Sequence, residues 1–248
     1  MRIIPAQHKN EMSQKAAALF AEQIHLKPDS VLGLATGETP RELYKELIAL
    51  YEKGDLDFSQ VVTFNLDEYV GLSPENDQSY IYYMHDSLFD HVNLLPENCF
   101  VPNGMAVDLD AECRTYDQRI KELGGIDLQL LGIGVNGHIA FNEPASYFEK
   151  STHVVQLTPS TIAVNSQYFA DPNEMPTSAL TMGINSIFQA KRIVLIASGP
   201  QKAQIIHAAF FGPITPEVPA SILQMHRDVT LVADADALSV IAEQESDY

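Results

Sequence analysis

The sequence predicts an α/β protein built on an open, mostly parallel, Rossmann-like sheet with helices on both faces. Residues 31–35, 126–131 and 192–197 are short, mainly apolar runs, each with the length and composition of a parallel strand buried on both sides. A glycine turn follows each run, and stretches with the apolar spacing of helices lie between them. Alternating strands and helices are typical of a parallel sheet with crossover helices.

Length and composition favour one domain over residues 1–248. A chain of 248 residues with 46% hydrophobic content can bury one large core. The chain has 15 Lys and Arg residues against 33 Asp and Glu residues, which gives a net charge of −18. Such a charge argues against nucleic acid or an anionic membrane surface as a partner, so we expect a small molecule.

The sequence shows no targeting or metal-binding pattern. The first residues have too little apolar character for a signal-peptide core, and no run of about 18 apolar residues occurs, so we expect a cytoplasmic protein. Cys99 and Cys113 have neither CxxC nor Cys/His spacing, and His85 and His91 would not share a helical face. We therefore expect neither a metal site nor a disulfide framework.

The predicted elements can be placed in order along the chain. In the first half, strands are predicted at residues 2–4, 31–35 and 61–66, and helices at 13–24, 40–52 and 110–123. In the second half, strands are predicted at 126–131, 153–157, 192–197 and 229–232, and helices from about 160, at 182–190 and at 200–210. A loop is expected at 172–176, the polar segment 145–152 is expected to be mobile, and the acidic tail 243–248 is expected to fray.

The second predicted strand runs through a glycine turn into a helix. Thr39 is predicted as the N-cap, with Pro40 at the first helical position and Glu42 completing a capping box. Unpaired backbone N–H groups and the positive end of a helix dipole suit a phosphate, which makes Gly37, Glu38 and Thr39 candidate ligands. A well-capped helix without a ligand is the alternative.

The strand predicted at 192–197 leads into a turn of the same design. Gly199 and Pro200 follow it, and Lys202 stands near the open end of the next helix. A lysine ammonium there could meet a phosphate oxygen. Because the protein as a whole is negative, an anionic ligand would need such local donors.

The strand predicted at 61–66 ends in two carboxylates, Asp67 and Glu68. Successive strand residues point to opposite faces, so only one of the two can act as a base in a site. A solvated acidic loop is the commoner fate of such a pair. The position at the end of a buried strand favours a functional carboxylate.

The motif LGIGVNGHIAFNEP at residues 131–144 directly follows an apolar strand. Its three glycines mark where the backbone turns sharply or allows a close approach, and His138 follows the last of them. Ligands bind at the carboxyl ends of parallel strands, and imidazole titrates near neutrality. We therefore predict that His138 is catalytic, with a structural histidine bonded to the backbone as the alternative.

Gly132, Gly134 and Gly137 also spell G-x-G-x-x-G, the dinucleotide-binding fingerprint. That fingerprint needs a helix opening at its last glycine and an acidic residue about 20 positions later. Here Pro144 interrupts the segment, and the next predicted strand ends at Thr158 without an acidic residue. The context therefore favours a catalytic loop over a nucleotide site.

Four motifs together resemble the glucosamine-6-phosphate deaminase (isomerase) family: FNLDEYVGL, GIGVNGHIAFNEP, the LATGETP turn and DAECRTYDQRI. The similarity runs from the first residues nearly to the last predicted strand. It implies conversion of glucosamine 6-phosphate and water to fructose 6-phosphate and ammonia, without a metal or an organic cofactor. It also implies that Asp67 moves a proton from C2 to C1, and that His138 opens the sugar ring with help from Glu143 and Asn136.

The implied roles fit the chemistry of these side chains. Ring opening moves a proton between O1 and the ring oxygen, which suits a histidine oriented by a carboxylate such as Glu143. Isomerisation needs a carboxylate that takes a proton from C2 and returns it to the neighbouring carbon, which suits Asp67.

Three positions depart from the family pattern. Longer relatives commonly carry an aspartate in place of Asn136, and an amide can hold His138 but cannot stabilise an imidazolium by charge. Glu38 replaces a glycine, so its carboxylate must point away from any phosphate. Ile162 stands where a phosphate-clamping arginine is found in the relatives, which leaves Lys202 as the matched cation.

Two other functions stay open. One is a 6-phosphogluconolactonase-like hydrolase, which needs no base at Asp67 and releases no ammonia. The other is a sugar-phosphate sensor without turnover, although the sequence shows no helix-turn-helix segment and no basic face.

The family resemblance also bears on assembly and regulation. Larger members are hexamers activated by N-acetylglucosamine 6-phosphate, and they continue beyond the point where this chain stops. The tail 243–248 offers no cation for a second phosphate. We therefore expect a monomer or small homo-oligomer with hyperbolic kinetics.

Overall fold

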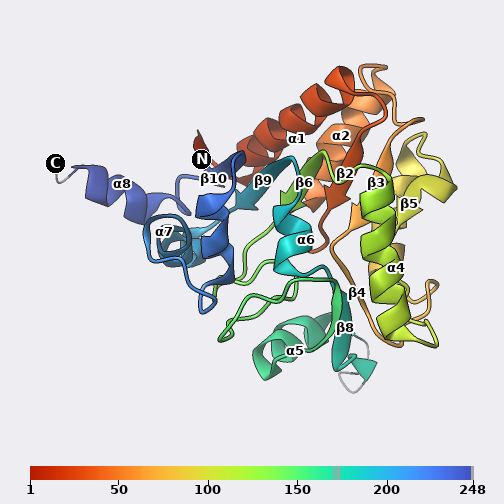
Figure 1. Cartoon of the computed structure of the whole chain (residues 1–248). Coiled ribbons are helices and arrows are strands. Elements are labelled where there is room, and N and C mark those ends of the chain that lie inside the picture. The colour runs from red at the N-terminus through yellow and green to blue at the C-terminus, as the bar shows by residue number, and fades with distance from the viewer. Residues whose placement is uncertain (170, 172–173, 247–248) are drawn as a thin grey trace.

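The computed structural model describes residues 1–169, 171 and 174–246. Seven strands form one parallel sheet in the order β1-β10-β9-β6-β2-β3-β5 (Figure 1). They are β1 (Arg2–Ala6), β2 (Val31–Leu34), β3 (Val62–Asn65), β5 (Cys99–Phe100), β6 (Leu128–Leu131), β9 (Arg192–Ala197) and β10 (Val229–Asp234). The sheet is open, because β1 and β5 form its two edges. The predicted fold class is confirmed.

Helices cover both faces of this sheet (Figure 1). They are α1 (Lys9–Leu26), α2 (Arg41–Glu52), α3 (Tyr80–Ser87), α4 (Leu109–Glu122), α5 (Pro159–Asn165), α6 (Ile184–Phe188), α7 (Ala203–Phe211) and α8 (Ser239–Ser246). Helix α1 packs against α2 and against β1, β9 and β10, and α7 packs against α8. None of the described helices combines the length and apolar character needed to cross a bilayer.

A second, antiparallel sheet has the order β4-β8-β7 and lies outside the main sheet. Its strands are β4 (Asp67–Tyr69), β7 (His153–Gln156) and β8 (Ser178–Thr181). The chain passes from β3 to β4 through the single residue Leu66, whose carbonyl accepts the N–H of Met182 at 2.8 Å. A small apolar cluster that includes Tyr69, Phe141 and Phe169 packs around this sheet.

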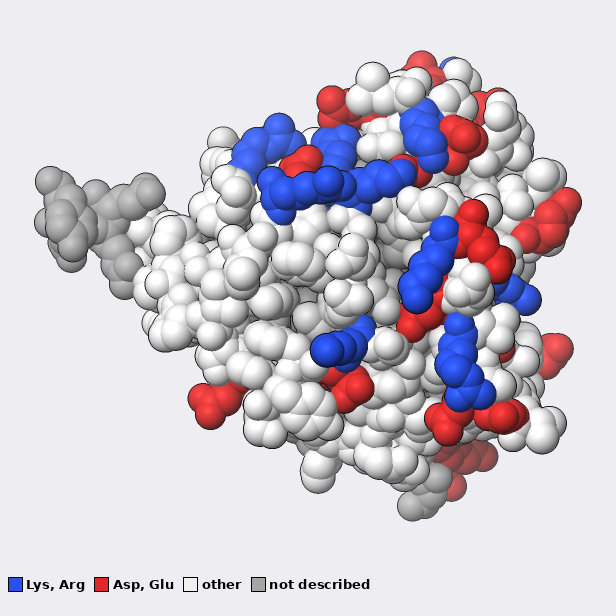
Figure 2. Space-filling view, in the orientation of Figure 1, with Lys and Arg blue, Asp and Glu red and all other residues white. Residues whose placement is uncertain are grey.

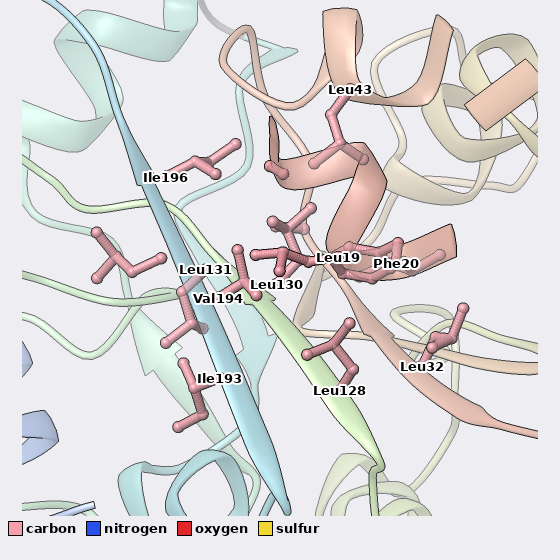
Figure 3. Close-up of a cluster of buried hydrophobic side chains, with 14 of the residues drawn as sticks. Leu19, Phe20, Leu32, Leu43, Leu128, Leu130, Leu131, Ile193, Val194 and Ile196 are labelled. Carbon is pink, nitrogen blue, oxygen red and sulfur yellow. The ribbon is translucent and has the colours of Figure 1, made fainter. Parts of the chain in front are cut away.

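The main core fixes the central strands. Every residue of β2, β6 and β10 is buried, which explains their mainly apolar sequences. Figure 3 shows side chains from α1, α2 and the central strands packed together: Leu19, Phe20, Leu32, Leu43, Leu128, Leu130, Leu131, Ile193, Val194 and Ile196. Burial of each large aliphatic side chain contributes about 1.5–3 kcal/mol, so the ends of β6 and β9 are held firmly in place.

The amino-terminal edge of the main sheet carries several paired basic residues. Asp127 is 4% exposed, and its two carboxylate oxygens lie 2.6 Å from Lys27 Nζ and 2.7 Å from Lys191 Nζ. Arg192 lies 3.6 Å from carboxylate oxygens of Glu22 and Asp228. Figure 2 shows a band of Lys and Arg side chains across the upper part of one face, with acidic side chains next to it. The absence of a nucleic-acid partner stays a prediction.

The start of α2 differs from the prediction. The helix begins at Arg41, its N-cap residue is Pro40 in a helical conformation, and no side chain caps it. Thr39 therefore is not the N-cap, and Glu42 forms an ion pair with Lys45 at 2.8 Å in place of a capping box. The reason is that residues 38–40 form a turn before the helix. The Pro40 carbonyl then accepts the first helical hydrogen bond, from the N–H of Tyr44.

Two other helix boundaries shift for local reasons. Helix α1 begins before the predicted residue 13, because Nδ1 of His8 accepts the N–H of Glu11 at 3.3 Å and caps the helix. Helix α6 is shorter than the predicted 182–190, because β8 continues to Thr181 and Gly183 is extended.

Three predicted loop or tail segments have different outcomes. Segment 145–152 contains no helix or strand, but it is anchored where Ala145 N–H donates to the carbonyl of residue 216 at 3.1 Å. Its mobility stays a prediction. Residues 172–173 of the loop predicted at 172–176 lie outside the described residues. In the tail, α8 continues to Ser246, and residues 247–248 lie outside the described part of the chain.

Candidate active site

The loops that carry the predicted site residues leave the same edge of the main sheet. They follow β9, β6, β2 and β3, which are neighbours in that order. Because parallel strands end at the same edge, the loops 198–202, 132–143 and 35–40 converge there with Asp67. The structure therefore brings together the segments that the sequence motifs singled out.

The loop after β6 is a tight turn that places the His138 ring on Gly134. Gly137 has φ of 87° and donates to the Gly134 carbonyl at 3.0 Å, and Gly134 donates to the His138 carbonyl at 2.9 Å. A Cβ atom on Gly134 would lie 2.4 Å from the imidazole, so only glycine fits there. No helix opens at Gly137, since residues 132–152 contain none. The glycine spacing serves this turn and does not form a dinucleotide site.

Glu143 lies against His138. Oε1 of Glu143 is 3.2 Å from Nδ1 of His138, which is ion-pair distance, although Nδ1 forms no hydrogen bond with the described residues. Asn136 Nδ2 donates to Oε2 at 2.6 Å, and Thr161 Oγ1 donates to Oε1 at 2.8 Å. Burial alone would raise the pKa of the Glu143 carboxyl, but the contacts with His138, Thr161 and Asn136 outweigh burial and lower this pKa. Glu143 is therefore ionised near neutral pH and can orient an imidazolium.

Asp67 is a buried carboxyl with no hydrogen-bond or ion-pair partner among the described residues. It lies at the start of β4, where the chain has just left the main sheet. Burial and, second, the charge of Glu68 raise the pKa of Asp67 from about 3.8 to about 8. A carboxylate whose pKa lies near the working pH is well matched to taking and returning a proton.

Glu68 has a structural role. Its Oε1 accepts the N–H groups of Tyr69 at 2.8 Å and Tyr80 at 2.9 Å, and its Oε2 accepts that of Ile81 at 2.9 Å. Burial raises the pKa of Glu68, and the three N–H groups lower it in part. The Glu68 side chain thus caps the start of α3, and its oxygens are occupied by these backbone bonds. Asp67 is therefore the carboxyl of this pair that can react.

The turn after β2 presents backbone N–H groups. Gly37 has φ of 102°, and its carbonyl accepts the hydroxyl of Tyr83 at 2.6 Å. Within the described chain, the N–H groups of Gly37, Glu38 and Thr39 donate to no acceptor. The Glu38 side chain is 71% exposed and lies 3.5 Å from the ammonium of Lys9, so its carboxylate points to solvent, as predicted.

Lys202 joins the turn after β9 to the loop after β6. Its ammonium donates to the Ile133 carbonyl at 2.6 Å, and burial lowers the pKa of Lys202. Two N–H groups of the ammonium remain for a ligand. Asp234 holds the turn itself by accepting the N–H of Gly199 at 3.0 Å and the hydroxyl of Ser198.

Two residues of α5 bear on the site in different ways. The half-buried side chain of Ile162 packs against the apolar cluster of the small sheet and offers no charge. Thr161, which the sequence reasoning missed, bonds Glu143. The sequence signal at Thr161 indicated only the start of a helix, because its partner lies 18 residues earlier in the chain.

The other histidines and the cysteines lie in ordinary contacts. His85 Nδ1 is 2.7 Å from Asp90, and His91 Nε2 is 2.8 Å from the Asp86 carbonyl. Cys99 and Cys113 are free thiols, and burial raises the pKa of both to about 11. Across the described residues, no group of three or more His, Cys, Asp or Glu side chains could hold a metal ion.

Several known proteins are similar to this chain. A glucosamine-6-phosphate deaminase of Lachnoclostridium phytofermentans is 58% identical over 232 residues, which cover 94% of this chain and 98% of that protein. A glucosamine-6-phosphate deaminase of Clostridium botulinum (strain Langeland) is 54% identical over 239 residues, covering 96% and 98%.

Solved structures agree with this relationship. The structure of a monomeric glucosamine-6-phosphate deaminase superposes with a TM-score of 0.94 at 47% identity and covers 97% of this chain and 100% of that one. A 6-phosphogluconolactonase from Trypanosoma cruzi shares the fold, with a TM-score of 0.77 at 19% identity and 96% coverage of both chains. The profile of the glucosamine-6-phosphate isomerase/6-phosphogluconolactonase family matches residues 5–232, so the chain belongs to this family.

Proposed function

We propose that this protein is a glucosamine-6-phosphate deaminase, which converts glucosamine 6-phosphate and water to fructose 6-phosphate and ammonia. Relatives at 58% and 54% identity over nearly the whole chain carry that name. The observation that carries the proposal is the buried Asp67, which has no hydrogen-bond or ion-pair partner among the described residues and a pKa of about 8. It lies at the same sheet edge as the His138–Glu143 pair. A hydrolase of 6-phosphogluconolactone would need no such base.

Ring opening is assigned to His138. In this step His138 takes the proton of the O1 hydroxyl and delivers it to the ring oxygen as the bond between C1 and the ring oxygen breaks, which frees the aldehyde. Glu143 supports the imidazolium that forms, because its carboxylate lies 3.2 Å from Nδ1. Asn136 contributes no charge, but its amide fixes the second carboxylate oxygen of Glu143 at 2.6 Å.

Isomerisation and loss of ammonia are assigned to Asp67. The ionised carboxylate removes the C2 proton of the open-chain amino aldehyde, and the electron pair forms an enolate over C2, C1 and O1. Return of this proton to C1, with loss of one proton from the amine and gain of one proton by O1, leaves an imine at C2 and a hydroxyl at C1. Water then adds to the imine carbon and ammonia departs, which gives the ketone of fructose 6-phosphate.

The phosphate is assigned to the two glycine turns. The free N–H groups of Gly37, Glu38 and Thr39 lie where helix α2 begins, and the positive end of the helix dipole favours an anion there. Lys202 supplies a cation whose remaining N–H groups can meet the phosphate oxygens. Because Ile162 is uncharged and packs in the apolar cluster, Lys202 carries most of the positive charge for the contact with the phosphate.

The test is ammonia release by the purified protein. Glucosamine 6-phosphate, N-acetylglucosamine 6-phosphate and 6-phosphogluconolactone are compared with and without a metal chelator. Ammonia from the first substrate alone, unchanged by the chelator, is the expected result. Lactone hydrolysis without ammonia release would replace the proposal with a lactonase. Sugar-phosphate binding without turnover would replace it with a sensor.

We infer further that one catalytic domain acts as a monomer in the cytoplasm, without a cofactor. The family profile runs through residues 5–232, and a monomeric deaminase is 47% identical to this chain. The expected substrate titration is hyperbolic, and N-acetylglucosamine 6-phosphate does not activate. A sigmoidal curve that this sugar phosphate makes hyperbolic, or the mass of a hexamer in solution, would refute the inference.

A further inference from the structure

We propose that Thr161 on α5 is a positioning residue, whose hydroxyl fixes the Glu143 carboxylate for its contact with His138. The inference rests on the function proposed above and deepens it. It assigns to α5 a part in ring opening that neither the motifs nor the names of the relatives indicate.

Two threonine hydroxyls form a directed chain that ends on Glu143. Thr158 Oγ1 donates to Thr161 Oγ1 at 3.0 Å, and Thr161 Oγ1 donates to Glu143 Oε1 at 2.8 Å. A hydroxyl has one hydrogen, so a Thr161 oxygen that receives a bond from Thr158 is free to direct its own hydrogen to the carboxylate. Each bond in such a chain polarises the next. Thr158 is also the N-cap of α5, so the chain starts from a fixed point of that helix.

The carboxylate of Glu143 is held at both ends by neutral groups. Asn136 binds Oε2, and Thr161 binds Oε1, the same oxygen that lies 3.2 Å from His138 Nδ1. Neutral donors fix the orientation of a carboxylate and leave its charge intact, whereas a lysine or arginine would cancel that charge. The full negative charge of Glu143 is therefore available to His138 when the imidazole gains a proton.

Helix α5 lies between β7 and β8 in sequence, so Thr161 links the small sheet to the loop after β6. Its neighbour Ile162 packs against the apolar cluster of that sheet, which anchors the helix there. The Thr161 hydroxyl is thus a direct bond between an element of the small sheet and the candidate ring-opening pair.

The experiment compares three variants of the full chain. Thr161→Val removes the hydroxyl at constant shape, and Thr161→Ser keeps it. Ser166→Ala removes a hydroxyl at the end of α5 whose one partner among the described residues is the Ala163 carbonyl, at 3.3 Å. We expect Thr161→Val to lower kcat about 10- to 100-fold, the usual effect of a small misplacement in a site. Its KM is expected to stay within a few fold. Thr161→Ser should recover most of the rate, and Ser166→Ala should match the wild type.

A second measurement does not depend on turnover. The pKa of the Glu143 carboxyl, followed by carbon-13 NMR, is expected to rise in Thr161→Val and to stay low in Thr161→Ser and Ser166→Ala. Among the groups that act on this carboxyl, His138 is the titratable one, while Asn136 and Thr161 are neutral. His138 is present in all three variants, so a difference in this pKa reports the loss of the Thr161 hydroxyl, through its own bond to Glu143 and through the contact with His138 that it fixes.

The two measurements separate the possible failures. An unchanged kcat together with an unchanged pKa of Glu143 in Thr161→Val would overturn the proposal. An equal loss of rate in Ser166→Ala would also overturn it, because the effect would then belong to the folding of α5. If the wild type released no ammonia, the proposed function would fail, while the NMR result would still decide whether Thr161 holds Glu143.

Discussion

Asp67 should make the stability of this protein fall as the pH rises, which is the reverse of the usual behaviour of an aspartate. Its pKa is about 8 in the folded protein and about 3.8 without the fold. Between these values the folded state binds a proton that the unfolded state has lost. The contribution is fully present below pH 4 and is lost as the pH rises to 8. At about 1.4 kcal/mol per pH unit, the upper bound is about 6 kcal/mol.

The substitution Asp67→Asn tests this reasoning, because the amide keeps the shape of the side chain and cannot ionise. Urea unfolding at pH 4, 6 and 8 should show similar stability of variant and wild type at pH 4, and a growing advantage of the variant at higher pH. Glu75→Gln, which removes an exposed carboxylate, serves as the control for a change in net charge. A difference between Asp67→Asn and the wild type that does not vary with pH would refute the argument.

The same substitution tests the proposed chemistry. Asp67→Asn should abolish ammonia release and exchange of the C2 proton, while sugar-phosphate binding stays within a few fold. In the wild type, about one tenth of a base with a pKa of about 8 is ionised at pH 7, so kcat/KM should rise until about pH 8. Near-normal turnover by the variant would remove Asp67 from the mechanism.

Three further substitutions probe the ring-opening group, the phosphate contact and a buried ion pair. His138→Gln should slow the reaction of the cyclic sugar far more than that of an open-chain analogue; equal losses would move His138 to another step. Lys202→Ala should raise KM for the phosphorylated substrate by the equivalent of about 1.5–3 kcal/mol, and unphosphorylated glucosamine reacting equally well would contradict the phosphate assignment. Asp127→Ala should lower the free energy of unfolding by about 1.5–3 kcal/mol, measured by urea denaturation. Although burial opposes it, bonding to Lys191 and Lys27 lowers the pKa of Asp127, so this stabilisation should be present above pH 4 and disappear as the pH falls below it.

Most of the main sheet could be predicted because its longer strands are mainly apolar and are separated by helical patterns. Strands β6 and β9 are largely buried on both sides of the sheet. A strand buried in this way has a mostly apolar sequence, which is why such runs predict it. The small sheet was only partly predictable. Strand β8 is four residues long and pairs with β4, whose sequence lies more than 100 positions earlier, so nothing in its local pattern indicates its partner.

Part of the candidate site could also be predicted from the sequence. Asn136, His138 and Glu143 lie in one short motif, and the structure brings their side chains into contact. Their catalytic roles stay predictions. The N-cap assignment of Thr39 was wrong because capping patterns depend on residue types alone. In the structure, the turn at Gly37 determines where the helix begins.

The chain passes from the main sheet to the small sheet at Leu66, between β3 and β4. As a result, the two residues proposed to carry protons, Asp67 and His138, are held by different sheets. Asp67 belongs to the small sheet, whereas His138 lies on a loop of the main sheet. A relative displacement of the two sheets would change the distance between these side chains and leave the buried strands around each of them intact. Selection could therefore adjust the spacing of base and ring-opening group to sugars of different shape through the contact between the sheets, without replacing either residue.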